Sequence, residues 1–456
     1  MKNILFISSI IIVLAGFSSC EDFLNVQPES ATGAQDYFLN DNEVESGVIA
    51  CYDGLQEQYD GTYSYVLMEI RSDNTTTVEH EGDYNLIDKC KDTPINSVTT
   101  EFWRSCYNTI FKTNTVLANI DNCTNANRKS QYEGEALFIR ALTYFNLVRL
   151  FGEIPLIDKI VYEGDNEAYS KKSVDDIYNL IIADLLAAAK LLPKQYGAAN
   201  LGRATSGAVK GLLAKIYLTR HDYSSSKTLL EELMGTTFSY GLMAKYYDIF
   251  YNNEMNKEIL FAVRYKSAAG NEGQSFSYEM TRLGGVIRGN NPTSDLLSAY
   301  ESGDLRYNVS VTNDLMCGKY LSTASQHDAG NDWIVLRYAD VLLMYAEVVN
   351  EMSGPTQSSI DILNSIRNRA GLSTLSLTGF DKGSLRNTIY HERRIELAME
   401  SHRWFDLIRT GTVDAVMTAH ASVEGFNYES KRNLFPIPQR EIDVSNGFLT
   451  QNPNFN

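Results

Sequence analysis

The segment YEGEALFIRALTYFNLVRLF, residues 132–151, decides the fold class, because it is apolar on two neighbouring faces of a helix. One face carries Leu137, Ala141, Tyr144 and Val148, and the next face carries Phe138, Leu142 and Phe145. A helix that is apolar on two faces is buried between its neighbours. The segment therefore predicts a mainly α fold in which this helix packs on both sides.

Helical periodicity continues through most of the chain on either side of this segment. Further helices are predicted at residues 101–120, 175–192, 204–235, 334–351, 358–370 and 388–409. The stretch 204–235 comes close to the small and aromatic spacing of a tetratricopeptide repeat. The residues at these positions are Ala214, Tyr217, Tyr223, Ser226 and Leu230. We expect a tetratricopeptide-like helical-repeat core at about residues 100–235 and 333–410.

Two long polar segments do not fit a helical core. Residues 71–100 and residues 266–293 show no sustained period, and the second segment is rich in glycine. Loops of this length in a compact domain are usually functional or disordered. Ligand-loop regions are therefore predicted at about residues 60–100 and 258–330. A short strand is predicted at the start of the second region, in EILFAVRY, residues 258–265.

The composition argues against nucleic-acid binding. The 456 residues carry 57 acidic and 40 basic side chains, which gives a net charge of −17, and no basic stripe offsets this balance. Such a chain repels a phosphate backbone, so no nucleic acid is expected as a partner. The hydrophobic fraction of 44% is ordinary for a globular protein with a core.

The N-terminus, MKNILFISSIIIVLAGFSSC, has the pattern of a secretion signal that ends in a lipid-anchoring cysteine. Lys2 supplies a short positive region, and the apolar run from Ile4 to Phe17 is too short to span a bilayer comfortably. Cys20 follows small residues, as in a bacterial lipoprotein box, where the signal is cleaved before a cysteine that carries lipid. The prediction is a signal peptide at residues 1–19, a lipidated tether to the membrane at 20–40 and a single domain at 41–456.

Five further cysteines are present, at Cys51, Cys90, Cys106, Cys123 and Cys317. Their number is odd, and none has the spacing of a zinc site. One pair could form a disulfide in an oxidising compartment. Buried free thiols are the favoured interpretation.

No catalytic motif selects an active site. The chain has no G-x-S-x-G, P-loop or dinucleotide-binding sequence, and neither of its two His-Glu pairs continues to H-E-x-x-H. Two Asp or Glu residues that meet in space could still form a carboxylate pair for glycoside hydrolysis. No local motif selects such a pair, so the prediction is a protein that is not an enzyme.

Glutamates recur every four residues in HERRIELAMESHRW, residues 391–404, at Glu392, Glu396 and Glu400. Arginines are interleaved with them, at Arg393, Arg394 and Arg403. A carboxylate metal site is one interpretation. The favoured one is a solvated or packed face that is neutralised by its own arginines, so no metal site is predicted.

Short blocks typical of one family recur almost from end to end of the chain. They are CEDFL at 20–24, EIRSDN at 69–74, EALFIRALTYF at 135–145 with LFGEIPL at 150–156, RYAD at 337–340 with YAE at 345–347, NSIRNRAG at 364–371, ERRIEL at 392–397 with RWFDL at 403–407, and LFPIP at 434–438. Through these blocks the chain resembles the SusD/RagB family of surface lipoproteins from Bacteroidota.

The resemblance implies a tetratricopeptide-rich α fold and a binding protein without catalytic activity. Such a protein lies over a SusC-like, TonB-dependent transporter of the cell outer membrane and hands it oligosaccharides or other oligomeric nutrients. Glu21 and Asp22 resemble the export signal of this phylum, which implies that the protein faces the cell exterior. Some relatives hold calcium, but the sequence does not support it here, and no cofactor is expected.

Two alternative functions remain open. One is a helical-repeat scaffold of the envelope without a small ligand, and the other is a lipoprotein glycoside hydrolase. The two long polar loops favour a binding protein over a scaffold, and the missing catalytic motifs favour it over a hydrolase.

A neutral glycan offers hydroxyl groups and flat C–H faces, so its site needs aromatic planes beside amide, carboxylate and guanidinium groups. Trp103 and Trp404 lie in helical blocks, and Trp333 is expected to pack at the start of a helix. The planes are therefore expected from Tyr, Phe or His of the two loops, and the family often makes ligand contacts just after the EIRSDN block. The predicted ligand-binding residues are Arg71, Asp73, His80, Asp83, Tyr84, Asn85, Tyr265, Gln274, Phe276 and Tyr278.

Overall fold

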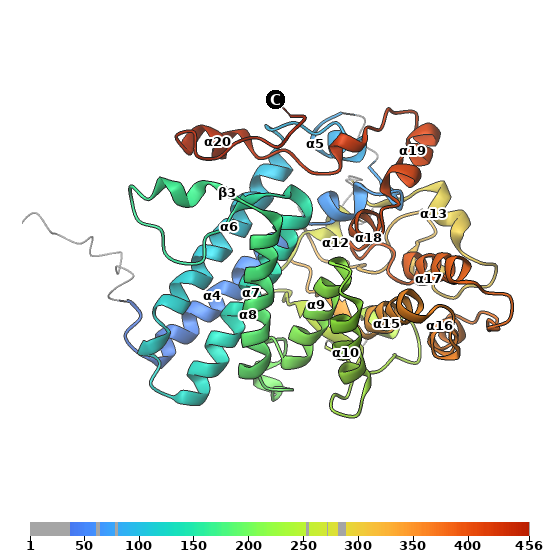
Figure 1. Cartoon of the computed structure of the whole chain (residues 1–456), viewed down its shortest axis with the longest axis horizontal. Helices are drawn as coiled ribbons and strands as arrows, with labels where there is room; N and C mark the ends of the chain where they lie inside the picture. Colours follow the sequence, from blue (N-terminus) through green and yellow to red (C-terminus); the bar gives the residue numbers. More distant parts are fainter. Residues whose placement is uncertain are drawn as a thin grey trace, which may run out of the picture.

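The computed structural model describes residues 37–60, 64–77, 81–251, 255–270, 272–280 and 289–455 (Figure 1). The α-helices are α4 Asp41–Tyr59, α5 Asp83–Asp88, α6 Ser97–Ala118, α7 Ala126–Phe151, α8 Val174–Leu191, α9 Ser206–Thr219, α10 Tyr223–Met234, α11 Asp248–Tyr251, α12 Phe276–Glu279, α13 Ser294–Ala299, α14 Tyr307–Ser310, α15 Tyr338–Ser353, α16 Gln357–Arg369, α17 Lys382–Glu396, α18 Arg403–Arg409, α19 Val413–Glu424 and α20 Gln439–Val444. Short π- and 3-10 turns are η2 Val66–Ile70, η3 Ile120–Asn122, η4 Asn166–Tyr169, η5 Ala198–Asn200 and η7 Ser430–Arg432. The strands are β1 Thr75–Thr76, β2 Ile154–Pro155, β3 Lys171–Lys172, β4 Ile259–Val263, β5 Asn291–Pro292 and β6 Trp333–Arg337.

The long helices pack in order of sequence into one continuous array. Helix α7 contacts α4, α6 and α8, helix α9 contacts α8 and α10, and helix α15 contacts α10, α16 and α17. In Figure 1 the array runs from α4 and α6 on one side of the molecule to α16 and α17 on the other. The predicted mainly α fold with a tetratricopeptide-like core is confirmed.

Helix α7 has the two buried faces that its sequence predicts. Every residue of both faces is buried, from Leu137 to Val148. Asn125 caps the helix start by accepting hydrogen bonds from two backbone N–H groups of the first turn, and Gly152 ends the helix at a positive φ of 74°. A buried ion pair joins the helix to α8, because the guanidinium of Arg140 donates to both carboxylate oxygens of Asp184 over 2.8 Å.

One predicted helix begins too early in the sequence. The predicted helix starts at Ile334, but residues Trp333–Arg337 form β6, and α15 begins at Tyr338. Strand β6 pairs antiparallel with β4, Ile259–Val263, which confirms the strand expected at residues 258–265. Trp333 is therefore a buried strand residue rather than a residue that packs at a helix start.

The helix predicted over residues 388–409 is interrupted. Helix α17 ends at Glu396, and α18 begins at Arg403. Between them, Met399 and Ser401 have positive φ angles of 65° and 62°, which no α-helix contains. A buried carboxylate from a distant part of the chain, described below, binds this turn.

The cysteines agree with the favoured interpretation. Cys51, Cys90, Cys106, Cys123 and Cys317 are all buried and free. Cys20 lies outside the described residues. Among the helices that the structure describes, none is both long and apolar enough to cross a membrane.

Candidate functional site

The two polar segments singled out by the sequence lie side by side. Strand β1, Thr75–Thr76, pairs antiparallel with β5, Asn291–Pro292. Thr293 extends the contact, because its backbone N–H donates to the carbonyl of Asn74 over 2.9 Å and its hydroxyl donates to the carbonyl of Asp73 over 2.8 Å. The fold therefore joins two segments that lie far apart in the sequence.

Arg71 and Asp73 are enclosed by the fold. The Arg71 guanidinium is 4.4 Å from the ring centre of Phe435, and it is hydrogen-bonded to the Asp92 carboxylate. The Asp73 carboxylate accepts two hydrogen bonds from Arg403, at 2.7 and 2.8 Å. Both side chains are buried and internally paired, which does not agree with the predicted role as surface ligand contacts.

Three predicted residues of the second loop are also part of the core. Phe276 is fully buried, with its ring edge-on to Trp333 at 5.0 Å between centroids. The Tyr265 hydroxyl donates to the carbonyl of Gln56 over 2.8 Å, and the buried Gln274 amide donates to the hydroxyl of Ser277 over 2.7 Å. Because these groups face inward, they do not form the predicted platform. Polar composition marked the segment as a loop, but distant parts of the chain cover it.

The remaining predicted residues differ in exposure. Tyr84 is buried in α5, whereas Asp83, Asn85 and Tyr278 keep part of their side chains exposed. The Asp83 carboxylate accepts a hydrogen bond from the backbone N–H of Ser97 over 2.8 Å, so it also caps the start of α6. His80 lies outside the described residues. Burial takes Tyr84 out of the predicted aromatic platform. A ligand role for Asp83, Asn85, Tyr278 and His80 stays a prediction.

Glu69 links the EIRSDN block to the turn between α17 and α18. Its buried carboxylate accepts hydrogen bonds from the Asn74 amide at 2.9 Å and from the backbone N–H groups of Met399 at 3.0 Å and Ser401 at 2.8 Å. Burial raises the pKa of this carboxyl to about 7, although the three donors act in the opposite direction. The carboxylate holds the left-handed turn in place, which gives this family block a role in the fold.

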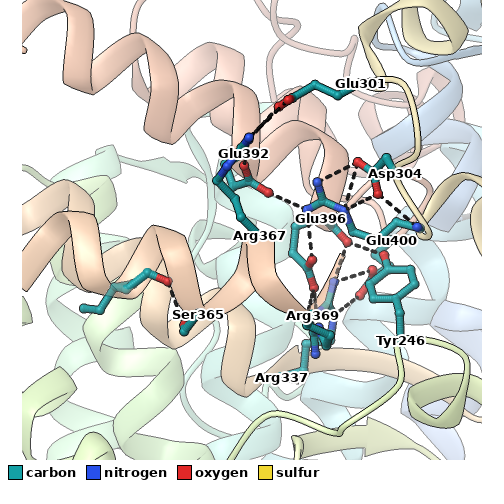
Figure 2. Close-up of polar contacts among 12 residues, drawn as sticks. Tyr246, Glu301, Asp304, Arg337, Ser365, Arg367, Arg369, Glu392, Glu396 and Glu400 are labelled. Carbon is teal, nitrogen blue, oxygen red and sulfur yellow. Dashed lines mark hydrogen bonds and ion pairs between the residues drawn. The ribbon is translucent and has the colours of Figure 1, made fainter. Parts of the chain in front are cut away.

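The repeated glutamates form a buried ion network (Figure 2). Glu396 pairs with Arg337 at 2.6 Å and with Arg369, and Glu400 pairs with Arg337 at 2.7 Å. Glu392 pairs with the buried Arg306. The glutamate face is therefore packed and neutralised by arginines, as the favoured interpretation predicts. These arginines, however, come from other segments of the chain.

The interleaved arginines pair elsewhere, which corrects the expectation that they neutralise their own glutamates. Arg393 pairs with Asp340 and Asp406, while Arg394 and Arg403 both pair with Asp73. Among the described residues, no group of His, Cys, Asp and Glu is arranged to hold a metal ion. The network is internal structure rather than a binding surface.

An open hollow near α11 and α14 is lined by aromatic, amide, hydroxyl and aliphatic groups. It encloses about 660 Å³. We call it the tyrosine hollow, and its lining residues are Tyr247, Tyr251, Tyr307, Asn308, Val309, Val311, Thr312, Asn313, Leu315, Gly318 and Leu321. None of these lining residues is charged. Most of them lie within the predicted ligand-loop region 258–330.

A stacked pair of tyrosines gives this hollow a flat aromatic surface. The rings of Tyr247 and Tyr251 are 4.5 Å apart between centroids and 24° from parallel. The Tyr251 hydroxyl donates to the carbonyl of Gly318 and accepts from the backbone N–H of Leu321 over 3.1 Å, so its ring is fixed. Tyr247 is 49% exposed, which leaves its ring accessible to a ligand.

The sequence contains a signal that could have found this pair. Tyr247 and Tyr251 are four residues apart in AKYYDIFYNN, a spacing that places two side chains together on one helical turn. Asn308 and Asn313 lie far from the two tyrosines in the sequence, so no short-range spacing relates them. Only the fold brings the two groups together.

Comparisons with known proteins agree with one another. A model described as "SusD family" matches residues 240–455, and a model described as "Starch-binding associating with outer membrane" matches residues 22–218. SusD-like protein P38 of Formosa agariphila is 27% identical over 99% of this chain and 99% of its own length. A SusD-like protein of Bacteroides ovatus is 27% identical over 89% of this chain and 83% of its own length.

Solved structures share the fold. Surface glycan-binding protein A of Bacteroides thetaiotaomicron superposes with a TM-score of 0.79 at 23% identity, covering 91% of this chain and 100% of that one. The same protein in complex with laminarihexaose gives a TM-score of 0.76 at 21% identity, covering 91% of this chain and 99% of that one. A laminarin-binding SusD-like protein gives 0.78 at 23% identity, with coverage of 91% and 99%.

Proposed function

The chain belongs to the SusD family, and we propose on this premise that it is a lipid-anchored protein of the outer surface that binds neutral oligosaccharides. In this proposal the tyrosine hollow is the binding site. The bound oligosaccharide is passed to a SusC-like, TonB-dependent transporter in the outer membrane. The protein itself carries out no reaction.

Relatives support a carbohydrate as the ligand. One of the two family models that match this chain is described as starch-binding, and it is also described as associating with the outer membrane. Four of the similar solved structures are described as glycan-binding proteins or as binding laminarin or a laminarin oligomer. Laminarin and starch are both neutral glucose polymers, which fits a site without charged side chains.

The observation that carries the proposal is the exposed ring of Tyr247, which stacks on the partly buried Tyr251 beside uncharged polar groups. A sugar ring presents a flat C–H face that packs on an aromatic plane, and its hydroxyl groups bond to amides and hydroxyls. Tyr247 and Tyr251 provide the plane, while Asn308, Thr312 and Asn313 provide the polar groups. A volume of about 660 Å³ is within the range of natural small-molecule sites.

We expect the double variant Tyr247→Ala/Asn308→Ala to bind its oligosaccharide about tenfold more weakly or worse. An aromatic contact contributes about 0.5–1.5 kcal/mol and a hydrogen bond about as much, and every 1.4 kcal/mol is tenfold in affinity. Both side chains are exposed, so the fold should survive the change. Isothermal titration calorimetry measures the affinity, and circular dichroism checks the fold.

Tyr162→Ala is the matched control, because this tyrosine is 73% exposed and does not line the tyrosine hollow. Its affinity should equal that of the wild type. Wild-type affinity in the double variant as well would place the sugar site elsewhere on the protein.

A further inference from the structure

A second, larger hollow lies at the opposite end of the helical array from α16. It encloses about 840 Å³ between α6, the segment 155–169 and the C-terminal segment 440–449. Helix α6, strand β3 and helix α20 mark this corner of the molecule in Figure 1. We call it the charged hollow.

Hydrogen bonds fix the walls of the charged hollow. The Tyr107 hydroxyl on α6 donates to the carbonyl of Pro155 over 2.8 Å. The Asn114 amide, one helical turn beyond Ile110, donates to the carbonyls of Ile157 at 2.9 Å and Lys159 at 3.3 Å. Residues 155–159, which form one wall of the hollow, are therefore tied to α6 at Tyr107 and Asn114.

Aromatic rings line the charged hollow, as they do the tyrosine hollow. Trp103 and Tyr107 lie 4.9 Å apart between centroids along α6. Phe111, one turn further, is 56% exposed, and Tyr169 on the facing segment is 38% exposed. Because Trp103 is buried, the rings that offer flat apolar surface to a ligand are those of Phe111 and Tyr169.

The charges of this hollow distinguish it from the tyrosine hollow. Three of its lining residues are basic, Arg104, Lys159 and Arg440, and two are acidic, Glu57 and Glu441. Arg104 pairs with Glu101 on its own helix at 2.8 Å. Within the described part of the chain, Lys159 and Arg440 have no ion pair and no side-chain hydrogen bond. A chain with a net charge of −17 thus places two cations without an ion pair in this hollow, beside the carboxylates of Glu57 and Glu441.

We propose that the charged hollow is a second binding site, which takes an anionic oligosaccharide. The aromatic rings pack against sugar faces, the amides of Asn108 and Asn166 bond to hydroxyl groups, and Lys159 and Arg440 pair with the acidic groups of the sugar. Carboxylate and sulfate groups share this chemistry. The site differs from the tyrosine hollow in its position and in the charge of its ligand. Either binding proposal can therefore be disproved without affecting the other.

The test uses three oligosaccharides of equal length, one with carboxylates (oligogalacturonate), one sulfated and one neutral, titrated into the chain from Glu21. At least one anionic probe should bind, and its affinity should fall between 50 and 200 mM NaCl, because salt screens exposed charges. Comparing the two anionic probes identifies the acidic group. Failure of both anionic probes to bind overturns the proposal, as does tighter binding of an acidic peptide of equal charge.

Variants locate the site. Lys159→Ala/Arg440→Ala should weaken the anionic probe by about tenfold or more, since each charge-assisted contact is worth roughly a factor of ten. Lys194→Ala, an exposed lysine outside both hollows, should leave the affinity unchanged. Tyr247→Ala/Asn308→Ala should leave it unchanged as well. An unaltered affinity in the first variant, or a loss in the last, would contradict the assignment.

Discussion

Replacement of Glu396 by alanine is expected to lower the free energy of unfolding by about 3–5 kcal/mol, because it leaves buried cations without their partner. The Glu396 carboxylate is fully buried and pairs with Arg337 at 2.6 Å, with Arg306 at 3.2 Å and with Arg369. These arginines come from three other segments, so the network joins the second half of the chain. Urea denaturation of the purified protein measures the change.

The matched control is Glu231→Ala, which breaks a surface pair with Lys227 on the same helix. Exposed pairs of this kind are worth at most about 1 kcal/mol. A loss for Glu396→Ala as small as the loss for the control would show that the network does not stabilise the fold.

The same variant should show a defined pH dependence. Burial on its own raises the pKa of the Glu396 carboxyl, but Arg369, Arg337 and Arg306 overcome this effect and lower the pKa to about 2. Because the pKa in the folded protein lies below its ordinary value of 4.5, the ion pairs contribute stability above pH 4.5 and lose it as the pH falls towards 2. The difference in unfolding free energy between wild type and variant should shrink over that window.

Cys20→Ala is expected to release the protein from the membrane. The apolar run that ends in small residues before Cys20 predicts cleavage at that point and lipid on the thiol. Two or more acyl chains give stable anchoring, since each buried CH₂ contributes about 0.8 kcal/mol. The wild type should incorporate labelled palmitate and sediment with membranes, and the variant should do neither.

Ser18→Ala serves as control, because it keeps the cysteine and a small residue before it. This control should stay in the membrane fraction. Retention of Cys20→Ala in the same fraction would mean that another part of the protein holds it there.

The helical core could be predicted because its signal is local. The two apolar faces of residues 132–151 are visible in one short stretch of sequence, and they predict α7 correctly. Strand β6 could not be separated from the helix that follows it, because its pairing partner, Ile259–Val263, lies in a much earlier part of the chain. The turn at Met399 depends on Glu69, which belongs to the opposite half of the sequence.

The site was harder to predict than the fold, because polarity does not reveal exposure. Arg71, Asp73 and Gln274 are polar residues of irregular segments, yet each is buried against partners from elsewhere in the fold. The tyrosine hollow was also missed, because it combines residues that lie far apart in the sequence. A helical turn at Tyr247 and a loop well beyond it in the sequence, around Asn308, form one surface only in the folded chain.

The most direct test of the central claim is an array of neutral and charged oligosaccharides and of peptides, probed with the chain from Glu21. The account predicts saturable binding of a neutral glucan or a related neutral oligosaccharide, and loss of that signal in Tyr247→Ala/Asn308→Ala. The claim would be contradicted if the folded protein bound only peptides, or if it bound no neutral oligosaccharide.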